Sequence, residues 1–236
     1  MLADVEKEKL AAARAAVALV EREMFVALGT GTTANHAIRA LAEKFPDGGG
    51  LTTVASSEAS ERLARSLGLR VRALSEGDVF DLMIDGADEV APDLSLTKGG
   101  GGALFREKVL ARESRALLIA VDHTKLVRAL GERKAIPVEV VRYARPVLMF
   151  RFRALGLNPE LRRHPDGSPY ITETGHEILD LHLTHSIDNP ETFDRQVQSF
   201  SGVVETGLFI GLAHRVFVGE SDGSVRELAP LGPGSA

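Results

Sequence analysis

Short apolar runs alternate with helix-like segments through the first half of the chain, and this alternation limits the possible folds more than any other feature. Apolar runs of strand length lie at residues 24–28, 52–55, 71–74, 80–84 and 116–121, and segments with helical spacing lie at 34–45, 58–67 and 103–113. Alternation of this kind is typical of a doubly wound α/β fold. We therefore predict a mainly parallel, Rossmann-like sheet for this part of the chain.

The pattern of segments changes near residue 131. Strand-like segments then lie at 137–141, 170–185, 203–209 and 216–218, and a helix-like segment lies at 191–200. We expect a smaller α+β subdomain at residues 130–205, which is a candidate for the subunit interface. Residues 1–129 together with 206–236 then form the Rossmann-like α/β catalytic domain, and the strands from residue 203 onward can return to its sheet.

The charge and the composition exclude several classes of protein. A net charge of −5 argues against a general nucleic-acid binder, which needs a surplus of basic residues. The chain has no cysteine, so disulfides, thiolate nucleophiles and cysteine metal sites are excluded. No apolar run approaches the roughly 20 residues that span a bilayer, and the first ten residues do not read as a secretion signal. We therefore expect a cytoplasmic protein with no membrane or nucleic-acid partner.

A loop of glycines and threonines at residues 29–33 (GTGTT) joins the first predicted strand to the first predicted helix. Glycines let the backbone approach an anion, N–H groups at a helix start attract negative charge, and threonine hydroxyls add donors. These features indicate a phosphate site. With Ala34 the loop also satisfies the dinucleotide pattern G-x-G-x-x-A, and Glu58 follows the second strand where a ribose-binding acid could lie. A tight turn without a ligand is the third interpretation, because short glycine motifs also match by chance.

Two aspartates follow the predicted strand at 80–84, within the sequence DGADE at residues 85–89. Ligands of open α/β sheets bind beyond the carboxyl ends of the strands, and Asp85 and Asp88 are expected there. The alternative interpretation is an ordinary turn, because Asp-Gly pairs are common in turns.

Lys98 precedes four consecutive glycines at residues 99–102. Such a run has a large entropy cost on folding and packs no side chain, so a backbone wrapped around a ligand oxygen is the better explanation. The compact ammonium of Lys98 suits a developing alkoxide. Glu107 follows on the face of the predicted helix nearest the glycines. It is either a carboxylate of the site or a solvated residue paired with Arg106 or Lys108.

Together these segments resemble the A-type ribose-5-phosphate isomerase family. The resembling stretches occur in the family's order and are GTGTT (29–33), DGADE (85–89), KGGGGALFREK (98–108), VDHTK ending at Lys125, and GVVETGLF (202–209). KGGGGAL with a glutamate five residues past its last glycine is the most specific of them.

The resemblance implies an aldose–ketose isomerase that interconverts ribose 5-phosphate and ribulose 5-phosphate in the non-oxidative pentose phosphate pathway. It implies that Glu107 is the catalytic base. It also implies a set of substrate-binding positions, which are Thr30, Gly31, Thr32, Thr33, Asp85, Gly86, Ala87, Asp88, Lys98, Gly99, Gly100, Gly101 and Lys125, with Lys9 added by its spacing in the N-terminal helix. Members of the family need neither a metal nor an organic cofactor and are usually homodimers or dimers of dimers.

The chemistry of such a reaction assigns a role to each group. Glu107 would carry a proton between C2 and C1 of an enediolate. The oxyanion would be held by Lys98 and by the N–H groups of residues 99–101. Asp85 or Asp88 would assist ring opening, and the phosphate would be held by the threonine loop and Lys125.

Other functions stay open at this point. An NAD-linked oxidoreductase would use Gly29, Gly31 and Ala34, but it leaves DGADE and KGGGG without a role. A sugar-phosphate-binding module would need neither Glu107 nor Lys98, and a CoA transferase with a nucleophilic glutamate would share a related scaffold. The seven histidines show no ligand spacing, so we expect no metal site.

Overall fold

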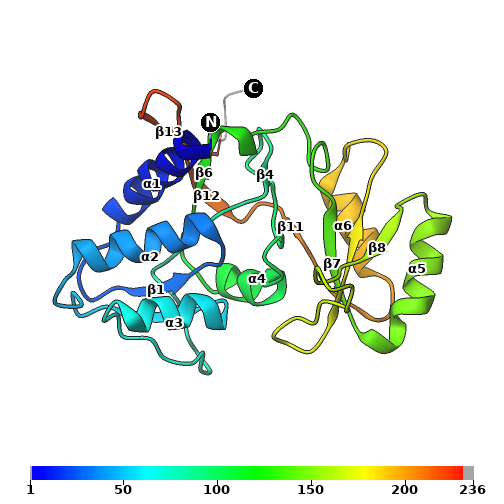
Figure 1. Ribbon diagram of the computed structural model, residues 1–236, viewed down its shortest axis with the longest axis horizontal. Helices are drawn as coiled ribbons and strands as arrows, with labels where there is room; N and C mark the ends of the chain where they lie inside the picture. The colour runs from blue at the N-terminus through cyan, green and yellow to red at the C-terminus, as the bar shows by residue number, and fades with distance from the viewer. Residues whose placement is uncertain (1, 231–236) are drawn as a thin grey trace. The chain divides into compact units, whose positions relative to one another are not determined.

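A computed structural model describes residues 2–230 of the chain, with side chains from residue 4 onward (Figure 1). Its helices are α1 (Leu2–Ala18), α2 (Thr32–Lys44), α3 (Glu58–Ser66), α4 (Leu104–Arg112), α5 (Arg145–Ala154) and α6 (Pro190–Gln198), with the 3₁₀ helices η1 (His123–Lys125) and η2 (Arg142–Ala144). Its strands are β1 (Phe25–Leu28), β2 (Thr52–Ala55), β3 (Leu82–Asp85), β4 (Glu89–Val90), β5 (Leu96–Thr97), β6 (Leu117–Asp122), β7 (Ile136–Val140), β8 (Pro159–Leu161), β9 (Glu177–Leu181), β10 (Val203–Thr206), β11 (Leu208–Phe209), β12 (Ala213–Gly219) and β13 (Val225–Leu228). Residues 231–236, which the sequence analysis assigns to the catalytic domain, lie outside the described residues.

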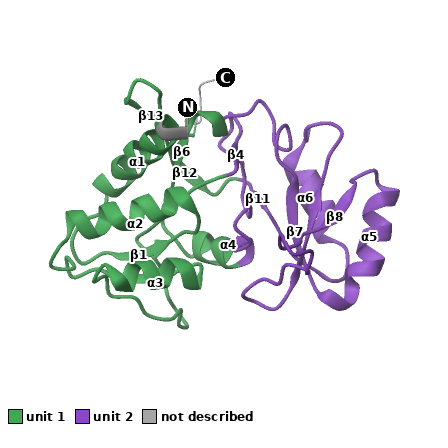
Figure 2. Ribbon diagram, in the orientation of Figure 1, with its two compact units in different colours: residues 1–87, 106–125, 211–236 green, residues 88–105, 126–210 purple. Residues whose placement is uncertain are grey.

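The chain is grouped into two compact units (Figure 2). The first unit consists of residues 1–87, 106–125 and 211–236, and the second of residues 88–105 and 126–210. Compared with the division expected from the sequence, the segment 88–105 is grouped with the smaller unit. The backbone therefore passes from one unit to the other four times, after residues 87, 105, 125 and 210.

The first unit is built on a six-stranded sheet in the order β13-β12-β6-β3-β1-β2. All neighbouring strands are parallel except β12 and the edge strand β13. Every residue of β3 and β6 is buried, as expected of parallel strands in a helix-covered sheet. Val17 of α1, Leu41 of α2 and Ala64 of α3 belong to the core against this sheet. The predicted doubly wound, mainly parallel fold is confirmed.

The second unit combines a four-stranded antiparallel sheet, in the order β10-β7-β9-β8, with helices α5 and α6. Val138 and Leu179 are register partners on β7 and β9 and are fully buried. Phe152 of α5 and Val197 of α6 complete the same core. A small three-stranded sheet, in the order β11-β5-β4, also belongs to this unit. The predicted α+β character of this part of the chain is confirmed.

Of the expected strands, one is absent and one is shorter than the sequence suggests. Residues 71–74 form no strand: Val71 makes an isolated bridge to Thr53, and Leu74 is exposed. Arginine alternates with apolar residues there, so too few side chains can be buried. Within the stretch 170–185 only β9 forms a strand, because a turn with Gly175 at φ of 83° separates β9 from the residues before it.

The stretch 203–209 does not return to the first sheet. It forms β10, which pairs with β7, and β11, which pairs with β5, and both partners lie in the second unit. Gly207 separates the two strands, and its N–H donates to the carbonyl of Pro137 at 2.7 Å. The run at 216–218 does join the first sheet as part of β12. Helix α5, in contrast, was not predicted.

Candidate active site

The two loops predicted to bind a ligand follow neighbouring parallel strands of the first unit. The strand order reverses at β1, which has β2 on one side and β3 on the other. Ligands of open α/β sheets bind at such a reversal, beyond the carboxyl ends of the strands. The GTGTT loop follows β1 and the DGA segment follows β3, so the fold brings Thr30 and Asp85 together.

Asp85 holds the beginning of the glycine loop. Its Oδ1 accepts hydrogen bonds from the N–H of Thr30 at 3.2 Å and from the N–H of Gly86 at 2.7 Å, and its side chain is fully buried. A Cβ atom on Gly29 would lie 2.0 Å from Cγ of Asp85. Residue 29 must therefore be glycine because of this close approach.

We expect Gly29→Ala to displace the Asp85 carboxylate and to lower both stability and activity. An overlap of this size forces the carboxylate or the loop to move, and overpacking of this kind costs about 1–3 kcal/mol. Thermal unfolding and kcat/KM measure the two effects. Gly86→Ala is the matched control for stability, because its Cβ would lie 3.4 Å from Cβ of Thr33, an ordinary contact. Equal losses of thermal stability in the two variants would contradict this account.

Two serines that the sequence analysis missed tie the glycine loop to α3. The hydroxyl oxygens of Ser56 and Thr30 lie 2.7 Å apart, and the Ser60 hydroxyl donates to the carbonyl of Gly29 at 2.7 Å. Both serines are buried. The available signal was the position of Ser56 directly after β2, at the carboxyl end of a further parallel strand, with Ser60 following in α3.

Helix α2 begins within the loop, and Lys9 reaches its first residue. Gly31 is the N-cap residue, so no side chain caps the N–H groups of the first turn. These N–H groups carry partial positive charge and favour an anion. Lys9 Nζ donates to Oγ1 of Thr32 at 3.2 Å and to Oε1 of Glu6 at 2.7 Å. The predicted phosphate loop therefore combines a helix N-terminus with a neighbouring lysine.

Lys125 lies in η1, directly after β6, which is the neighbour of β3. Asp122 shapes this turn by accepting hydrogen bonds from the N–H of Thr124 at 3.1 Å and from its hydroxyl. His123 Nδ1 lies 2.6 Å from Oε2 of the buried Glu8, and this hydrogen bond raises the pKa of the imidazole above its ordinary value of 6.5. Stabilisation from this pair is therefore full below pH 6.5 and is lost as the pH rises through the raised pKa.

Lys98 and the glycine run belong to the second unit and connect β5 to the start of α4. The lysine side chain is buried, with Nζ 5.4 Å from the ring centroid of Phe209, a cation–π contact. The N–H of Lys98 donates to the carbonyl of Gly207 at 2.8 Å. Gly99 and Gly102 have φ of 103° and 80°, so the run needs glycine at both of these positions.

Asp88 binds the backbone of the glycine run. Its Oδ2 accepts a hydrogen bond from the N–H of Gly100 at 2.7 Å. A Cβ atom on Gly100 would lie 2.7 Å from Oδ1 of Asp88, so glycine is required there too. The Gly100 N–H, expected to hold an oxyanion, therefore already donates to a carboxylate. Within residues 2–230, no acceptor contacts the N–H of Gly101.

Glu107 lies in the first turn of α4 and is only 3% exposed. It is therefore not the solvated surface residue of the alternative interpretation. Its neighbour Lys108 is also buried, and Arg106 donates to the carbonyl of Ala55 at 3.3 Å. The helix thus carries a carboxylate that is largely shielded from water within one turn of the glycine run.

Glu89, the last residue of DGADE, has a structural role. Its buried carboxylate accepts hydrogen bonds from the Thr97 hydroxyl at 3.2 Å and from the N–H groups of Gly131, Arg133 and Lys134 at 2.7, 2.7 and 2.9 Å. Carboxylates hold backbone N–H groups strongly, because the bonds are charge-assisted. Glu89 therefore anchors the loop before β7 to the small sheet of the second unit.

The structure distributes the predicted site residues over both units. The first unit holds Lys9, Thr30, Gly31, Thr32, Thr33, Asp85, Gly86, Ala87, Glu107 and Lys125, and the second holds Asp88, Lys98, Gly99, Gly100 and Gly101. Hydrogen bonds connect Thr30 with Asp85 in the first group and Gly100 with Asp88 in the second. The chemical role of each residue stays a prediction.

Within the described residues, the dinucleotide-binding interpretation of the glycine loop lacks a suitably placed acid. Glu58, the acid that a dinucleotide would use, is an exposed residue of α3 and pairs with Arg62 at 3.3 Å. Over the described range 2–230, no group of three histidine, aspartate or glutamate side chains is arranged to hold a metal ion.

Comparisons with known proteins agree on one family. The family model described as ribose 5-phosphate isomerase A (phosphoriboisomerase A) matches residues 52–223. Ribose-5-phosphate isomerase A of Deinococcus radiodurans is 44% identical over 227 residues, which cover 95% of this chain and 99% of that protein. The protein of the same name from Chloroflexus aurantiacus is 44% identical over 92% of both chains.

Solved structures lead to the same family. A D-ribose-5-phosphate isomerase in complex with phospho-erythronic acid matches with a TM-score of 0.91 and 33% identity, over 95% of this chain and 99% of that one. Ribose 5-phosphate isomerase A of Methanocaldococcus jannaschii matches with a TM-score of 0.88 and 33% identity, over 94% and 97%. Because the family model, the relatives and the solved structures all agree, the chain belongs to the ribose 5-phosphate isomerase A family.

Proposed function

We propose that this chain interconverts ribose 5-phosphate and ribulose 5-phosphate, the aldose–ketose step of the non-oxidative pentose phosphate pathway. The proposal rests mainly on Glu107, which is buried in the first turn of the helix that follows the KGGGG run. Membership of the family adds to this support. The relatives' names support the substrate. The Rossmann-like unit then supplies the catalytic base.

The direct test is an assay of purified, EDTA-treated protein on ribose 5-phosphate, with detection of ribulose 5-phosphate. We expect product without any added metal or nucleotide. Turnover that depends on added NAD, followed as NADH absorbance, would support the oxidoreductase interpretation instead. A protein that binds ribose 5-phosphate without converting it would be the sugar-phosphate-binding module.

Glu107 is the proposed proton carrier of this reaction. The reaction moves one proton between C2 and C1 through an enediolate, so a single carboxylate can remove the proton and return it. General-base catalysis by a positioned carboxylate contributes roughly 10²–10⁴ in rate. Shielding from water supports this role, because it protects the enediolate from side reactions.

The oxyanion of the enediolate needs preorganised donors. We assign this role to the ammonium of Lys98 and to the N–H of Gly101, because the N–H of Gly100 donates to Asp88. For ring opening we favour Asp88 over Asp85. Asp88 is partly exposed, whereas Asp85 is fully buried and holds the N–H groups of the first loop.

Phospho-erythronic acid offers an independent probe of this chemistry. It is bound in one similar structure, a D-ribose-5-phosphate isomerase. The compound has a planar carboxylate at one end and a phosphate at the other. The enediolate of a five-carbon sugar phosphate likewise has two oxygens in one plane and a phosphate at its far end. A compound that mimics a reaction intermediate binds more tightly than the substrate. We therefore expect it to inhibit this chain competitively.

The phosphate is assigned to the first unit. The threonine loop at residues 30–33 begins α2, where the helix N-terminus favours an anion. Lys9 contacts this loop through Thr32, and Lys125 supplies a second ammonium after β6. Both ammonium groups complement the charge of a phosphate.

We expect Lys125→Ala to raise KM for ribose 5-phosphate about tenfold while kcat changes by less than about threefold. A charge-assisted hydrogen bond contributes about 1.5–3 kcal/mol, and 1.4 kcal/mol corresponds to a factor of ten. Steady-state kinetics measure both constants. Lys7→Ala is the control, because Lys7 is an exposed lysine of α1 and should leave KM unchanged. Equal KM values for the Lys125 variant and the unchanged protein would contradict the assignment.

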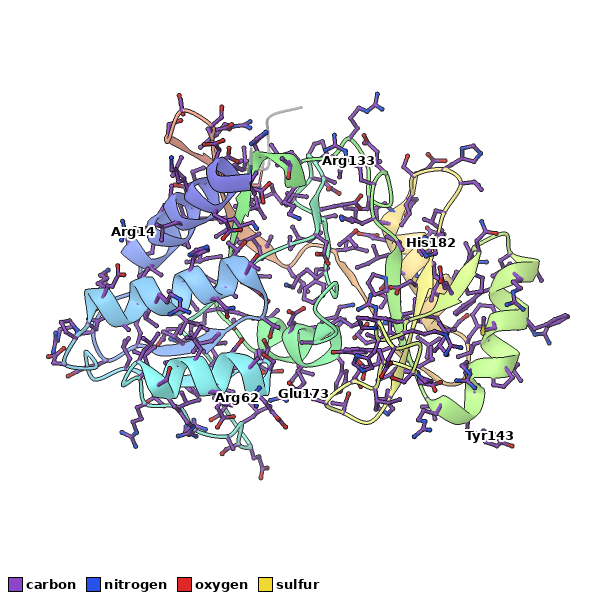
Figure 3. The ribbon with its side chains drawn as sticks, in the orientation of Figure 1. Arg14, Arg62, Arg133, Tyr143, Glu173 and His182 are labelled. Carbon is purple, nitrogen blue, oxygen red and sulfur yellow. The ribbon has the colours of Figure 1, made fainter. Side chains whose placement is uncertain are left out.

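A homo-oligomer, a dimer or tetramer, is part of the proposal. Three large apolar side chains on and beside α5 are exposed: Tyr143 by 95%, Val147 by 61% and Phe150 by 68%. Tyr143 is labelled in Figure 3. Exposed groups of this kind mark interaction surfaces, and we assign this one to a second copy of the chain. Light scattering on the purified protein measures its mass, and a monomer at micromolar concentration would contradict this part.

A cytoplasmic location completes the proposal. No helix between residues 2 and 230 combines the length and the hydropathy needed to cross a bilayer. The proposed partner is a small sugar phosphate, and neither a membrane nor a nucleic acid is expected to bind. Fractionation of cells followed by the isomerase assay would test the location.

A further inference from the structure

We propose that Arg162 is a positioning residue, which orients the glycine run so that the N–H of Gly101 can meet the oxyanion, and that Asp180 in turn holds Arg162. The proposal rests on the proposed function, because that function places the oxyanion on this run. Arg162 follows β8 and Asp180 lies on β9, and both belong to the second unit with the glycines.

The guanidinium of Arg162 contacts the backbone of the glycine run directly. Its Nη1 donates to the carbonyl of Gly99 at 2.6 Å and lies 3.4 Å from the carbonyl of Gly100. Arg162 and Gly99 are 63 residues apart in the sequence. The arginine side chain is only 16% exposed, so this contact is largely shielded from water.

Asp180 fixes the orientation of that guanidinium. Its Oδ2 accepts a hydrogen bond from Nε of Arg162 at 2.9 Å, and its Oδ1 accepts one from Nη2. Two parallel bonds of this kind hold a guanidinium in one plane, which a lysine cannot reproduce. Nη1 is then directed at the glycine carbonyls.

The contacts act on planar peptide groups. In a trans peptide the carbonyl of one residue and the N–H of the next point in opposite directions. The peptide between Gly99 and Gly100 is therefore held at both ends, its carbonyl by Arg162 and its N–H by Asp88 at 2.7 Å. The Gly100 carbonyl also lies toward Arg162, so the N–H of Gly101 is directed away from it.

A run of glycines needs such contacts from outside. Glycine has no side chain to restrict its backbone angles, so four in a row can adopt many conformations. An oxyanion donor stabilises charge only if its direction is set before the reaction. Arg162 and Asp88 restrict the first peptide, and the Tyr170 hydroxyl adds a contact to the Gly101 carbonyl at 3.3 Å.

The experiment compares Arg162→Met with Arg163→Met in the full chain. We expect Arg162→Met to lower kcat about 10–100-fold, because small misplacements of catalytic groups cost up to about 10²-fold, while KM stays within about twofold. Inhibition by phospho-erythronic acid should weaken by a similar factor, and inhibition by inorganic phosphate should stay unchanged. Arg163 is the matched control: its Nη1 donates to the carbonyl of Gly167 at 2.6 Å in an exposed turn, so Arg163→Met should behave as the unchanged protein.

Amide hydrogen exchange provides a readout that does not depend on activity. Peptides that cover residues 98–102 should exchange faster in Arg162→Met and in Asp180→Asn, and at the original rate in Arg163→Met. Arg162→Lys, which keeps the charge, should give an intermediate kcat. It replaces Arg162→Met in both measurements if the methionine variant does not fold.

Three results would overturn the positioning role: an unchanged kcat in Arg162→Met, unchanged exchange of residues 98–102, or equal weakening of phospho-erythronic acid and inorganic phosphate. The last result would indicate a general disturbance of the fold. If the unchanged protein does not isomerise ribose 5-phosphate, the proposed function fails, and the exchange measurement still decides whether Arg162 orders the glycine run.

Discussion

Replacing Glu107 by glutamine is expected to lower kcat for ribose 5-phosphate about 10³-fold, with KM changed by less than about threefold. Glutamine keeps the shape of this buried side chain but cannot accept a proton from carbon. The remaining groups would still bind the sugar phosphate, so the loss should appear in kcat. Transfer of deuterium from solvent to C1 or C2 should fall by the same factor, which identifies the proton step as the one affected.

The control for this variant is Glu113→Gln. Glu113 directly follows α4 and is exposed, so the same chemical change there should leave kcat and thermal stability unaffected. Glu107→Gln should also keep the unfolding temperature within a few degrees, because the exchange leaves the packing intact. A Glu107→Gln protein that retains the original kcat would show that another group carries the proton.

Glu89→Ala is expected to destabilise the protein by about 3–5 kcal/mol. The substitution removes the acceptor of four hydrogen bonds, and each buried donor left without a partner costs about 1–3 kcal/mol, part of which water entering the space recovers. In a chain of this size the unfolding temperature should fall by roughly 10 °C. Calorimetry or circular dichroism on heating measures the change.

Glu132→Ala tests whether burial sets the size of that effect. Glu132 lies in the same loop and accepts a hydrogen bond from the N–H of Arg128 at 2.9 Å, but its side chain is 24% exposed. Water can replace its carboxylate, so the expected loss is below about 1 kcal/mol. Similar losses of stability in the two variants would show that the burial of Glu89 does not set the size of the effect.

The sequence predicts the first unit well because its signals are local. Buried parallel strands appear as continuous apolar runs, and the glycines that end them mark the loops where ligands bind. The proximity of Thr30 and Asp85 follows from one topological rule, that neighbouring parallel strands present their carboxyl ends at the same edge of the sheet.

The second unit is harder to predict because its contacts join distant residues. Arg162 reaches Gly99 across 63 residues, and Glu89 binds N–H groups more than 40 residues away. No local pattern indicates which arginine among many will meet a given carbonyl. Helix α5 escapes detection for a related reason: exposed Val147 and Phe150 blur the apolar face that Leu148 and Phe152 bury.

The four passages of the backbone between the two units have a consequence for the evolution of this chain. Neither unit is one continuous stretch of gene, so recombination that exchanges a whole unit must join the chain at four places at once. Three of these places lie within two residues of Asp88, Glu107 and Lys125. We therefore expect the two units to be inherited as a pair, and new specificities to arise by point substitution rather than by shuffling of modules.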